Sequence, residues 1–149
     1  MGTHHKGTDE EVTALDAYIK LMRCAESFTA RVHAHLANAG LTFSQFQVLE
    51  VLYHLGPMCQ RDIAQKILKS TANLTVVVDN VEKRGLVERR RDTQDRRYVT
   101  VHLTDRGRQL IQEIFPRHVD ALVREMGILT KDEQEVLGRL CRKLGLKQG

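Results

Sequence analysis

The stretch that most constrains the fold is RRRDTQDRRYVTVHLT, residues 89–104, whose first nine residues hold five arginines and two aspartates. On either side of residues 92–96, the segments LVERRR and RYVTVHLT alternate polar and apolar side chains with the period of a β-strand. The residues between these segments are typical of a turn. The sequence therefore predicts a β-hairpin, whose second strand turns Val99, Val101 and Leu103 to one face.

The two aspartates of this stretch have expected roles in the hairpin. Asp92 is placed to favour the turn through its side-chain acceptor. Asp95 is expected to hold a neighbouring arginine in one rotamer by a charge-assisted hydrogen bond. Taken alone, the arginine run is equally typical of an edge strand that charge protects from aggregation, so its meaning depends on the elements around it.

The rest of the chain repeats apolar residues at helical spacing. Helices are predicted at about 9–38, 44–55, 61–68, 71–84, 105–126 and 131–144. Three of these helices begin with a Ser/Thr-x-x-Glu/Gln capping pattern, namely Thr8 with Glu11, Ser44 with Gln47, and Thr130 with Glu133. Ser70 is expected to cap the fourth helix, and Pro116 is expected to bend the fifth.

The fourth predicted helix follows the third after a tight break and is amphipathic. The residues expected to pack inward are Leu74, Val77, Val78 and Val81. The outer face carries Ala72, Asn73, Thr75, Val76, Asp79, Asn80 and Lys83. Donors, acceptors and methyl groups with few long charges suit the reading of base edges in a major groove. A plain solvated surface is the alternative for this helix taken alone.

Two short helices, the second polar on its outer face, followed at once by an arginine-rich hairpin, have the order of a winged helix-turn-helix. Such a hairpin presents arginines beside the second helix, where they meet phosphates or enter a narrow minor groove. We therefore predict a mainly α fold with a small β-hairpin wing, in which helices from both termini form a dimerisation region. The 149 residues are read as one domain.

The charge pattern agrees with a nucleic-acid partner. The chain carries +4 overall, with +5 inside residues 60–108 and −1 on the remainder. No apolar run approaches the roughly 20 residues of a membrane span, and the first eleven residues hold no apolar segment of the kind a signal peptide needs. The cytoplasm is the expected compartment, and no membrane partner is expected.

Signatures of enzymes are missing from the sequence. It has no P-loop, His-Glu-x-x-His, Gly-x-Ser-x-Gly or glycine-rich dinucleotide turn, so neither an enzyme nor a cofactor or metal is predicted. Cys24, Cys59 and Cys141 lack the spacing of a zinc site or disulfide framework and are read as free thiols. His33 and His35 are close in sequence, but side chains two residues apart on a helix point to different faces.

With these elements in place, the chain resembles the MarR family of bacterial and archaeal transcription regulators. The family's wing carries Asp-x-x-Asp-Arg-Arg followed by Leu-Thr-x-x-Gly, and these motifs stand here at residues 92–97 and 103–107. Residues 81–87, VEKRGLV, look like the end of its recognition helix and the following strand. The resemblance covers the whole chain, 1–149, and implies one domain with a winged helix-turn-helix lobe at about 44–104 and dimerisation helices at about 9–38 and 105–146.

The resemblance also implies a homodimeric repressor that binds double-stranded DNA at a pseudo-palindromic operator. Carried over by position, its DNA contacts are Ser70, Thr71, Asn73, Thr75, Val76, Arg90, Arg91, Asp95, Arg96 and Arg97. Arg97, supported by Asp95, stands in the place of the minor-groove arginine. The other wing arginines of this set are phosphate candidates.

A small aromatic or phenolic compound is the implied effector, which releases the DNA. The residues assigned to its pocket are Tyr18, Phe28, Arg31 and His33. The chain departs from the family pattern at Gln94, where a charged residue is common, and at Cys59, where a capping Ser or Thr is common. Two alternatives stay open, namely a redox- or metal-responsive regulator of the same fold and a ligand-independent architectural DNA-binding protein.

Overall fold

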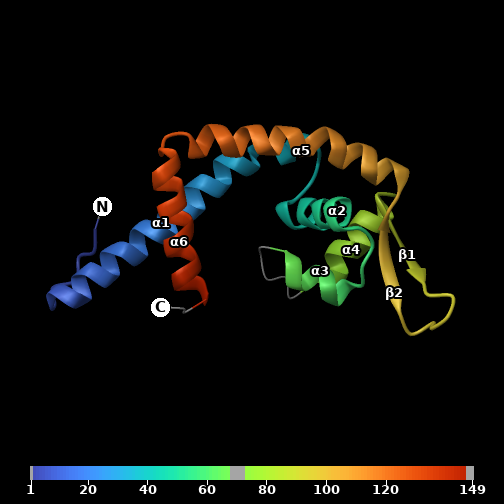
Figure 1. The fold of residues 1–149 in the computed structure, drawn as a ribbon, viewed down its shortest axis with the longest axis horizontal. Helices are drawn as coiled ribbons and strands as arrows, with labels where there is room; N and C mark the ends of the chain where they lie inside the picture. Colours follow the sequence, from blue (N-terminus) through green and yellow to red (C-terminus); the bar gives the residue numbers. More distant parts are fainter. Residues whose placement is uncertain (1, 68–72, 147–149) are drawn as a thin grey trace. The chain divides into compact units, whose positions relative to one another are not determined.

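The computed structural model describes residues 2–67 and 73–146 and has the predicted element order (Figure 1). Its helices are α1 (Asp9–Asn38), α2 (Phe43–Leu55), α3 (Gln60–Lys66), α4 (Leu74–Lys83), α5 (Asp105–Met126) and α6 (Lys131–Leu146). The strands β1 (Val87–Arg91) and β2 (Val99–Leu103) form one antiparallel hairpin. The fold is thus mainly α with a β-hairpin wing, as the sequence predicts.

The chain divides into two compact units. One unit comprises residues 33–118 and is called the winged lobe below. The other comprises residues 1–32 and 119–149 and is called the terminal unit. Helices α1 and α5 contribute residues to both units. The contacts of each side chain are therefore described within its own unit.

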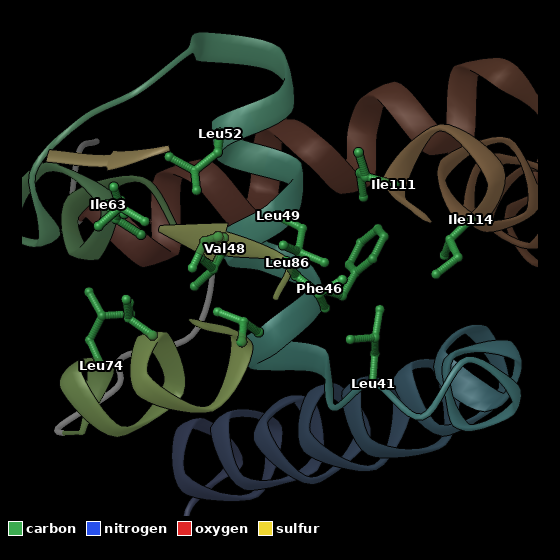
Figure 2. Close-up of a cluster of buried hydrophobic side chains, with 14 of the residues drawn as sticks. Leu41, Phe46, Val48, Leu49, Leu52, Ile63, Leu74, Leu86, Ile111 and Ile114 are labelled. Atoms are coloured by element: carbon green, nitrogen blue, oxygen red, sulfur yellow. The ribbon is translucent and has the colours of Figure 1, made fainter. Parts of the chain in front are cut away.

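A single apolar core holds the winged lobe together. Its largest fully buried side chains are Leu36, Phe46, Leu49, Leu52, Ile63, Leu86 and Ile111. Figure 2 shows apolar side chains from α2, α3, α4 and α5 meeting in this core, together with Leu41 just before α2 and Leu86 just before β1. Burying each such side chain stabilises the fold by roughly 1.5–3 kcal/mol, so the core fixes the faces that α3 and α4 turn outward.

The hairpin has the register that its alternation predicts. Arg89 pairs with Val101 and Arg91 with Val99, so the odd-numbered residues of the two strands share one face. Val101 on that face is fully buried. Its N–H donates to the Met58 carbonyl at 2.8 Å, which attaches the extended residue before α3 to β2.

The Leu-Thr-x-x-Gly motif joins the wing to α5 by a close approach of two backbones. Thr104 donates from its N–H to the Leu86 carbonyl at 3.1 Å and from its hydroxyl to the Gly85 carbonyl at 2.6 Å. The same hydroxyl accepts the Gly107 N–H at 3.1 Å and so caps α5. A Cβ on Gly107 would lie 1.9 Å from the Leu86 carbonyl oxygen, so only glycine fits there.

Two of the three predicted capping boxes are confirmed, and the third is wrong. Thr8 with Glu11 and Thr130 with Glu133 each exchange both capping hydrogen bonds. Helix α2, however, is capped by Thr42 with Gln45 rather than by Ser44 with Gln47. Both pairs fit the local pattern, and the structure uses the earlier one.

Local and distant hydrogen bonds together hold the turn just before α2. Within the turn, Gly40 N–H donates to the Ala37 carbonyl at 3.0 Å and Leu41 N–H to the Leu36 carbonyl at 3.1 Å. Arg84 donates to the carbonyls of Gly40 at 2.7 Å and Ala39 at 3.3 Å, and Gly40 adopts a φ of 68°. The turn therefore ends in time for Thr42 to cap the helix. Gln47, expected at the helix start, is instead a buried residue within α2.

The start of the fourth helix and the burial of Leu55 also differ from the expectations. Helix α4 begins at Leu74 with Asn73 as its N-cap, later than the predicted start at Thr71. Ser70 and Thr71 lie outside the described residues. Leu55 is exposed at the end of α2 rather than packed with the core. Pro116 lies inside α5, which is one continuous helix from Asp105 to Met126.

The terminal unit exposes many of its apolar side chains. No residue of α6 is buried. The exposed large apolar side chains of this unit are Tyr18, Leu21, Met22, Val119, Val123, Ile128, Val136, Leu137, Leu140, Leu144 and Leu146. Within residues 2–67 and 73–146, no helix is long and apolar enough to cross a membrane.

Candidate nucleic-acid interface

Helix α4 presents a short exposed surface, called the reading face below, formed by Asn73, Thr75 and Val76. The opposite side of the helix is buried through Leu74 and Val78. Because these apolar residues recur at helical spacing, their burial turns Thr75 and Val76 to solvent beside the N-cap residue Asn73. The reading face offers an amide, a hydroxyl and methyl groups, which is the chemistry that base edges in a major groove require.

The tip of the wing is braced by hydrogen bonds within itself. The Asp92 carboxylate accepts the Gln94 N–H at 2.8 Å, which confirms its predicted role in the turn. The Arg91 guanidinium donates to the Arg96 carbonyl at 2.9 Å across the turn. Arg91, expected to bind a phosphate, therefore has one of its donors committed to the shape of the hairpin.

Arg97 is held by Asp95 as predicted. The carboxylate accepts the Arg97 Nε–H at 3.0 Å and an Nη2–H at 2.9 Å, and it also accepts the Arg97 backbone N–H at 3.0 Å. These bonds lower the pKa of Asp95, the side-chain bond contributing most. The Arg97 side chain is 89% exposed, so the pair orders a guanidinium that projects into solvent.

The remaining wing arginines have unequal surroundings. Arg90 is paired with Glu88, whose carboxylate accepts its Nε–H at 2.6 Å. Arg96 is exposed, and among the described residues its guanidinium has no hydrogen-bond partner. The guanidinium of Arg96 is thus open to solvent, whereas that of Arg90 is partly engaged by Glu88.

Arg89 differs from all of these because its side chain is only 22% exposed. Its guanidinium contacts Asp79 and Glu82 of α4 and Gln60 of α3. Reasoning from the sequence missed this role. The signal was present in the alternation, since Arg89 lies opposite Val101 and shares its inward face.

The four residues assigned to an effector pocket fall in different units. Tyr18, Phe28 and Arg31 belong to the terminal unit, where Arg31 donates to Glu125 at 2.8 Å, while His33 belongs to the winged lobe. A cavity of about 240 Å³ in the winged lobe is lined instead by Arg84, Leu86, Arg106, Gln109, Leu110 and Glu113. The four-residue pocket therefore stays a prediction.

His33 and His35, whose side chains the sequence places on different faces of a helix, both lie near His118 of α5. His35 Nε2 and His118 Nδ1 are 3.1 Å apart, and the ring centres of His33 and His118 are 6.2 Å apart. Burial, followed by the charges of His35 and His33, lowers the pKa of His118 to about 4. Among the described residues, no group of three or more His, Cys, Asp or Glu side chains is arranged to hold a metal ion.

The three cysteines are free in the structure. Cys24 and Cys141 are exposed, and Cys59 is half-buried. Cys59 occupies the N-cap position of α3, and its side chain makes no capping hydrogen bond. The departure from a capping Ser or Thr therefore leaves the first turn of α3 without a side-chain cap.

Comparisons with known proteins agree with this architecture. Residues 41–99 match the model of the MarR family. The HTH-type transcriptional regulator MhqR of Bacillus subtilis is 32% identical over 133 residues, which cover 89% of this chain and 92% of that protein. The uncharacterised HTH-type transcriptional regulator YkoM of the same organism is 33% identical, covering 93% and 90% of the two chains. The solved structure of BpsR from Bordetella bronchiseptica is 27% identical, covers 95% of this chain and 97% of its own, and has a TM-score of 0.78.

Proposed function

Because the chain belongs to the MarR family of transcription regulators, and is thus a DNA-binding regulator rather than an enzyme, we propose that it is a homodimeric repressor of a pseudo-palindromic operator. Its place of action is then the cytoplasm, where bacterial and archaeal DNA lies. In each protomer, α4 enters a major groove and the wing follows the neighbouring minor groove. The observation that carries this proposal is the Arg97 guanidinium, exposed to solvent and held by Asp95.

The reading face and the wing have complementary roles in this proposal. Asn73, Thr75 and Val76 meet base edges and supply discrimination between sequences. Arg97 enters the minor groove, where a narrow groove concentrates negative potential. Arg90, Arg91 and Arg96 meet phosphates and supply affinity that depends on salt. Ser70 and Thr71 keep their assignment to the same surface as a proposal from sequence position alone.

Selection of bound duplexes from a random-sequence library tests this function directly. The wild-type protein should enrich a two-fold symmetric site whose halves are about one helical turn, roughly 34 Å, apart. Its affinity for the enriched duplex should fall steeply with salt and exceed its affinity for a scrambled duplex by at least about a thousandfold. Enrichment of no symmetric site would refute the proposal, because a dimer with two reading helices must leave that symmetry in its operator.

We also propose that a small aromatic or phenolic compound, bound near Tyr18, Phe28, Arg31 and His33, releases the operator. Support comes from BpsR, whose DNA binding is described as regulated by 6-hydroxynicotinic acid. A ligand that changes the separation of two DNA-binding lobes weakens their fit to sites one helical turn apart. A tenfold release needs a preference of only about 1.4 kcal/mol for the unbound form.

A mobility-shift titration with 6-hydroxynicotinic acid, salicylate and simple phenols tests the effector. At least one compound should release the enriched duplex at millimolar concentration and also raise the melting temperature of the free protein. Arg31→Gln removes the cation expected to face a carboxylate, so acids should lose more effect than uncharged phenols. If no compound releases DNA or stabilises the protein, the regulator acts without a ligand of this class.

A further inference from the structure

The two strands of the wing are tied to different helices at the same level of the hairpin. Arg89 of β1 lies opposite Val101 of β2. The Val101 N–H donates to the carbonyl of Met58, just before α3, at 2.8 Å. The Arg89 N–H donates to the Glu82 carboxylate of α4 at 2.9 Å. Both N–H groups of the pair thus face outward, and the hairpin is held on one edge by the chain entering α3 and on the other by α4.

The side chain of Arg89 adds to the connection with α4. Its Nη1 donates to Glu82 at 2.7 Å, so this carboxylate binds both the backbone and the side chain of Arg89. Its Nη2 lies 2.7 Å from the carboxylate of Asp79, three residues earlier on α4, and its Nε donates to Gln60 Oε1 of α3 at 3.1 Å. These bonds are mostly shielded from solvent, so salt screens them less than those of a surface ion pair. The four residues Gln60, Asp79, Glu82 and Arg89 are called the clamp below.

Beyond the clamp, the hairpin stands by itself. Among the described residues, residues 90–100 form hydrogen bonds and ion pairs only with other residues of the hairpin, 87–103. Arg97, which meets the minor groove in the proposed function, belongs to this part. Its position relative to the reading face is therefore set at the level of the clamp and at the base of the hairpin.

We propose that Glu82 and Arg89 are positioning residues, which hold Arg97 at a fixed distance from the reading face so that the major- and minor-groove contacts form together. When two contacts are joined rigidly at the right spacing, the second forms as an intramolecular step, and its contribution falls as the connection loosens. The clamp then sets the number of base pairs between the bases read by α4 and the A·T-rich segment that receives Arg97. The inference rests on the proposed function, because it assumes that both elements bind one duplex.

The contribution of Arg97 to binding, measured with and without the clamp, tests the inference. Arg97→Ala should lower the affinity of the wild-type protein for its selected duplex roughly tenfold, which corresponds to about 1.4 kcal/mol. Glu82→Leu removes both carboxylate bonds to Arg89 and keeps a good helix-forming residue. In that background, Arg97→Ala should lower affinity by about threefold at most, because a loosened wing contributes less. Glu113→Leu removes an exposed, ion-paired carboxylate of α5 as the matched control and should keep the tenfold effect.

A change of spacing in the DNA separates positioning from a general loss of stability. In a second duplex, the A·T-rich flank is moved by one base pair, about 3.4 Å along the axis. The wild-type protein should lose most of the Arg97 contribution on this duplex, whereas Glu82→Leu should bind the two duplexes with affinities within about twofold of each other. Arg89→Met removes the guanidinium but leaves its backbone bond to Glu82, so its preference should lie between the two. A clamp that only stabilised the lobe would leave the spacing preference of Glu82→Leu equal to that of the wild type, and this result would overturn the inference.

Amide hydrogen exchange of the free protein tests the clamp without DNA. The Arg89 N–H should exchange about tenfold faster in Glu82→Leu than in the wild type, whereas the Val101 N–H, bonded to Met58, should change by less than about twofold. Unchanged exchange at Arg89 would show that Glu82 does not hold this edge. If the wild-type protein selects no symmetric duplex, the proposed function fails and the positioning role falls with it. A selected duplex with an undiminished Arg97 effect in Glu82→Leu would overturn the positioning role alone.

Discussion

At the scale of single residues, the wing shows how one residue type acquires opposite roles within a few positions. Arg89 is packed against two carboxylates and the Gln60 amide. Arg97 is exposed and is held by Asp95, which lies in the same turn between the strands. Arg89 lies within β1 opposite the buried Val101, whereas Arg97 lies in the connection between the two strands. Removing these two arginines should therefore have different consequences.

Arg97→Ala should weaken operator binding by roughly 1 to 3 kcal/mol without changing thermal stability, because its guanidinium contacts solvent rather than the core. The loss should be larger on operators with A·T-rich flanks, whose minor grooves are narrow. Asp95→Ala should give part of the same loss by releasing the arginine from its rotamer. Competition binding measures both variants, and Arg106→Ala, at an exposed position of α5, is the matched control. Wild-type affinity in Arg97→Ala would disprove the minor-groove assignment.

His118 should make the stability of the fold depend on pH. Its pKa is lowered to about 4 by burial and by the neighbouring His35 and His33, from an ordinary value of 6.5. A group with a depressed folded-state pKa takes up protons first in the unfolded chain, so stability is full above about pH 6.5 and falls as the pH drops toward 4. From about pH 7.5 to about pH 5 the loss from this residue is about 2 kcal/mol.

Denaturant unfolding of the wild type and of His118→Gln at those two pH values measures this loss. The glutamine cannot be protonated, so its stability should decline less across the interval, by about 2 kcal/mol. The absolute stability of the variant does not enter the comparison, because only the change with pH is used. Equal declines in the two proteins would show that His118 takes up its proton equally readily in the folded and unfolded chains.

At the scale of elements, the junction between the wing and α5 is a close contact of two backbones. The Leu103-Thr104-x-x-Gly107 motif places the first turn of α5 against the chain entering β1, and three hydrogen bonds through Thr104 hold it there. Because β2 leads directly into α5, this junction also fixes the direction of the hairpin. The glycine of the Leu-Thr-x-x-Gly motif therefore has a structural role, because it allows this close approach.

Gly107→Ala should destabilise the protein by more than about 2 kcal/mol, because its methyl group would lie 1.9 Å from a backbone oxygen that cannot move without shifting β1. Gly138→Ala in α6 is the matched control. Among the described residues, nothing apart from its chain neighbours and its own helix backbone lies within 4 Å of the added Cβ. Alanine also favours a helix over glycine by up to about 1 kcal/mol. Thermal unfolding compares the two variants, and equal melting temperatures would contradict the close approach.

At the scale of the whole molecule, the terminal unit carries an apolar surface that is exposed to solvent in the single chain. Helix α6 has no buried residue, although Val136, Leu137, Leu140 and Leu144 recur on it at helical spacing. A contiguous apolar surface of this kind marks an interface with another protein. A second copy of the chain is the partner that we propose, which would place two reading helices on one operator.

Sedimentation at micromolar concentration should therefore give about twice the chain mass of 17.0 kDa. Leu140→Asp puts a charge in the proposed interface and should shift the protein toward monomers, and operator affinity should fall because only one reading helix then binds. Arg142→Asp, on the polar side of α6, is the matched control and should remain dimeric. A folded wild-type monomer at this concentration would contradict the proposed assembly.

The sequence by itself determined the elements whose signals are local. The capping pairs at Thr8 and Thr130, the alternation around Val101 and the helical spacing on α4 each depend on residues a few positions apart, and all appear in the structure. The Asp95–Arg97 pair was predictable for the same reason, since the partners are two residues apart. Family resemblance added the arrangement of these elements as a winged helix-turn-helix.

Tertiary structure alone decided the features that join distant parts of the chain. Arg84 reaches the carbonyls of Ala39 and Gly40, more than forty residues earlier in the chain. His118 lies beside His35 across 83 residues, and Arg89 reaches Gln60 across 29 residues. Such contacts form only when buried apolar faces bring their elements together, so no pattern of neighbouring residues contains them. The hydrogen bond from the Gln60 amide to the Thr75 hydroxyl belongs to this second group, because it forms only when α3 and α4 pack together.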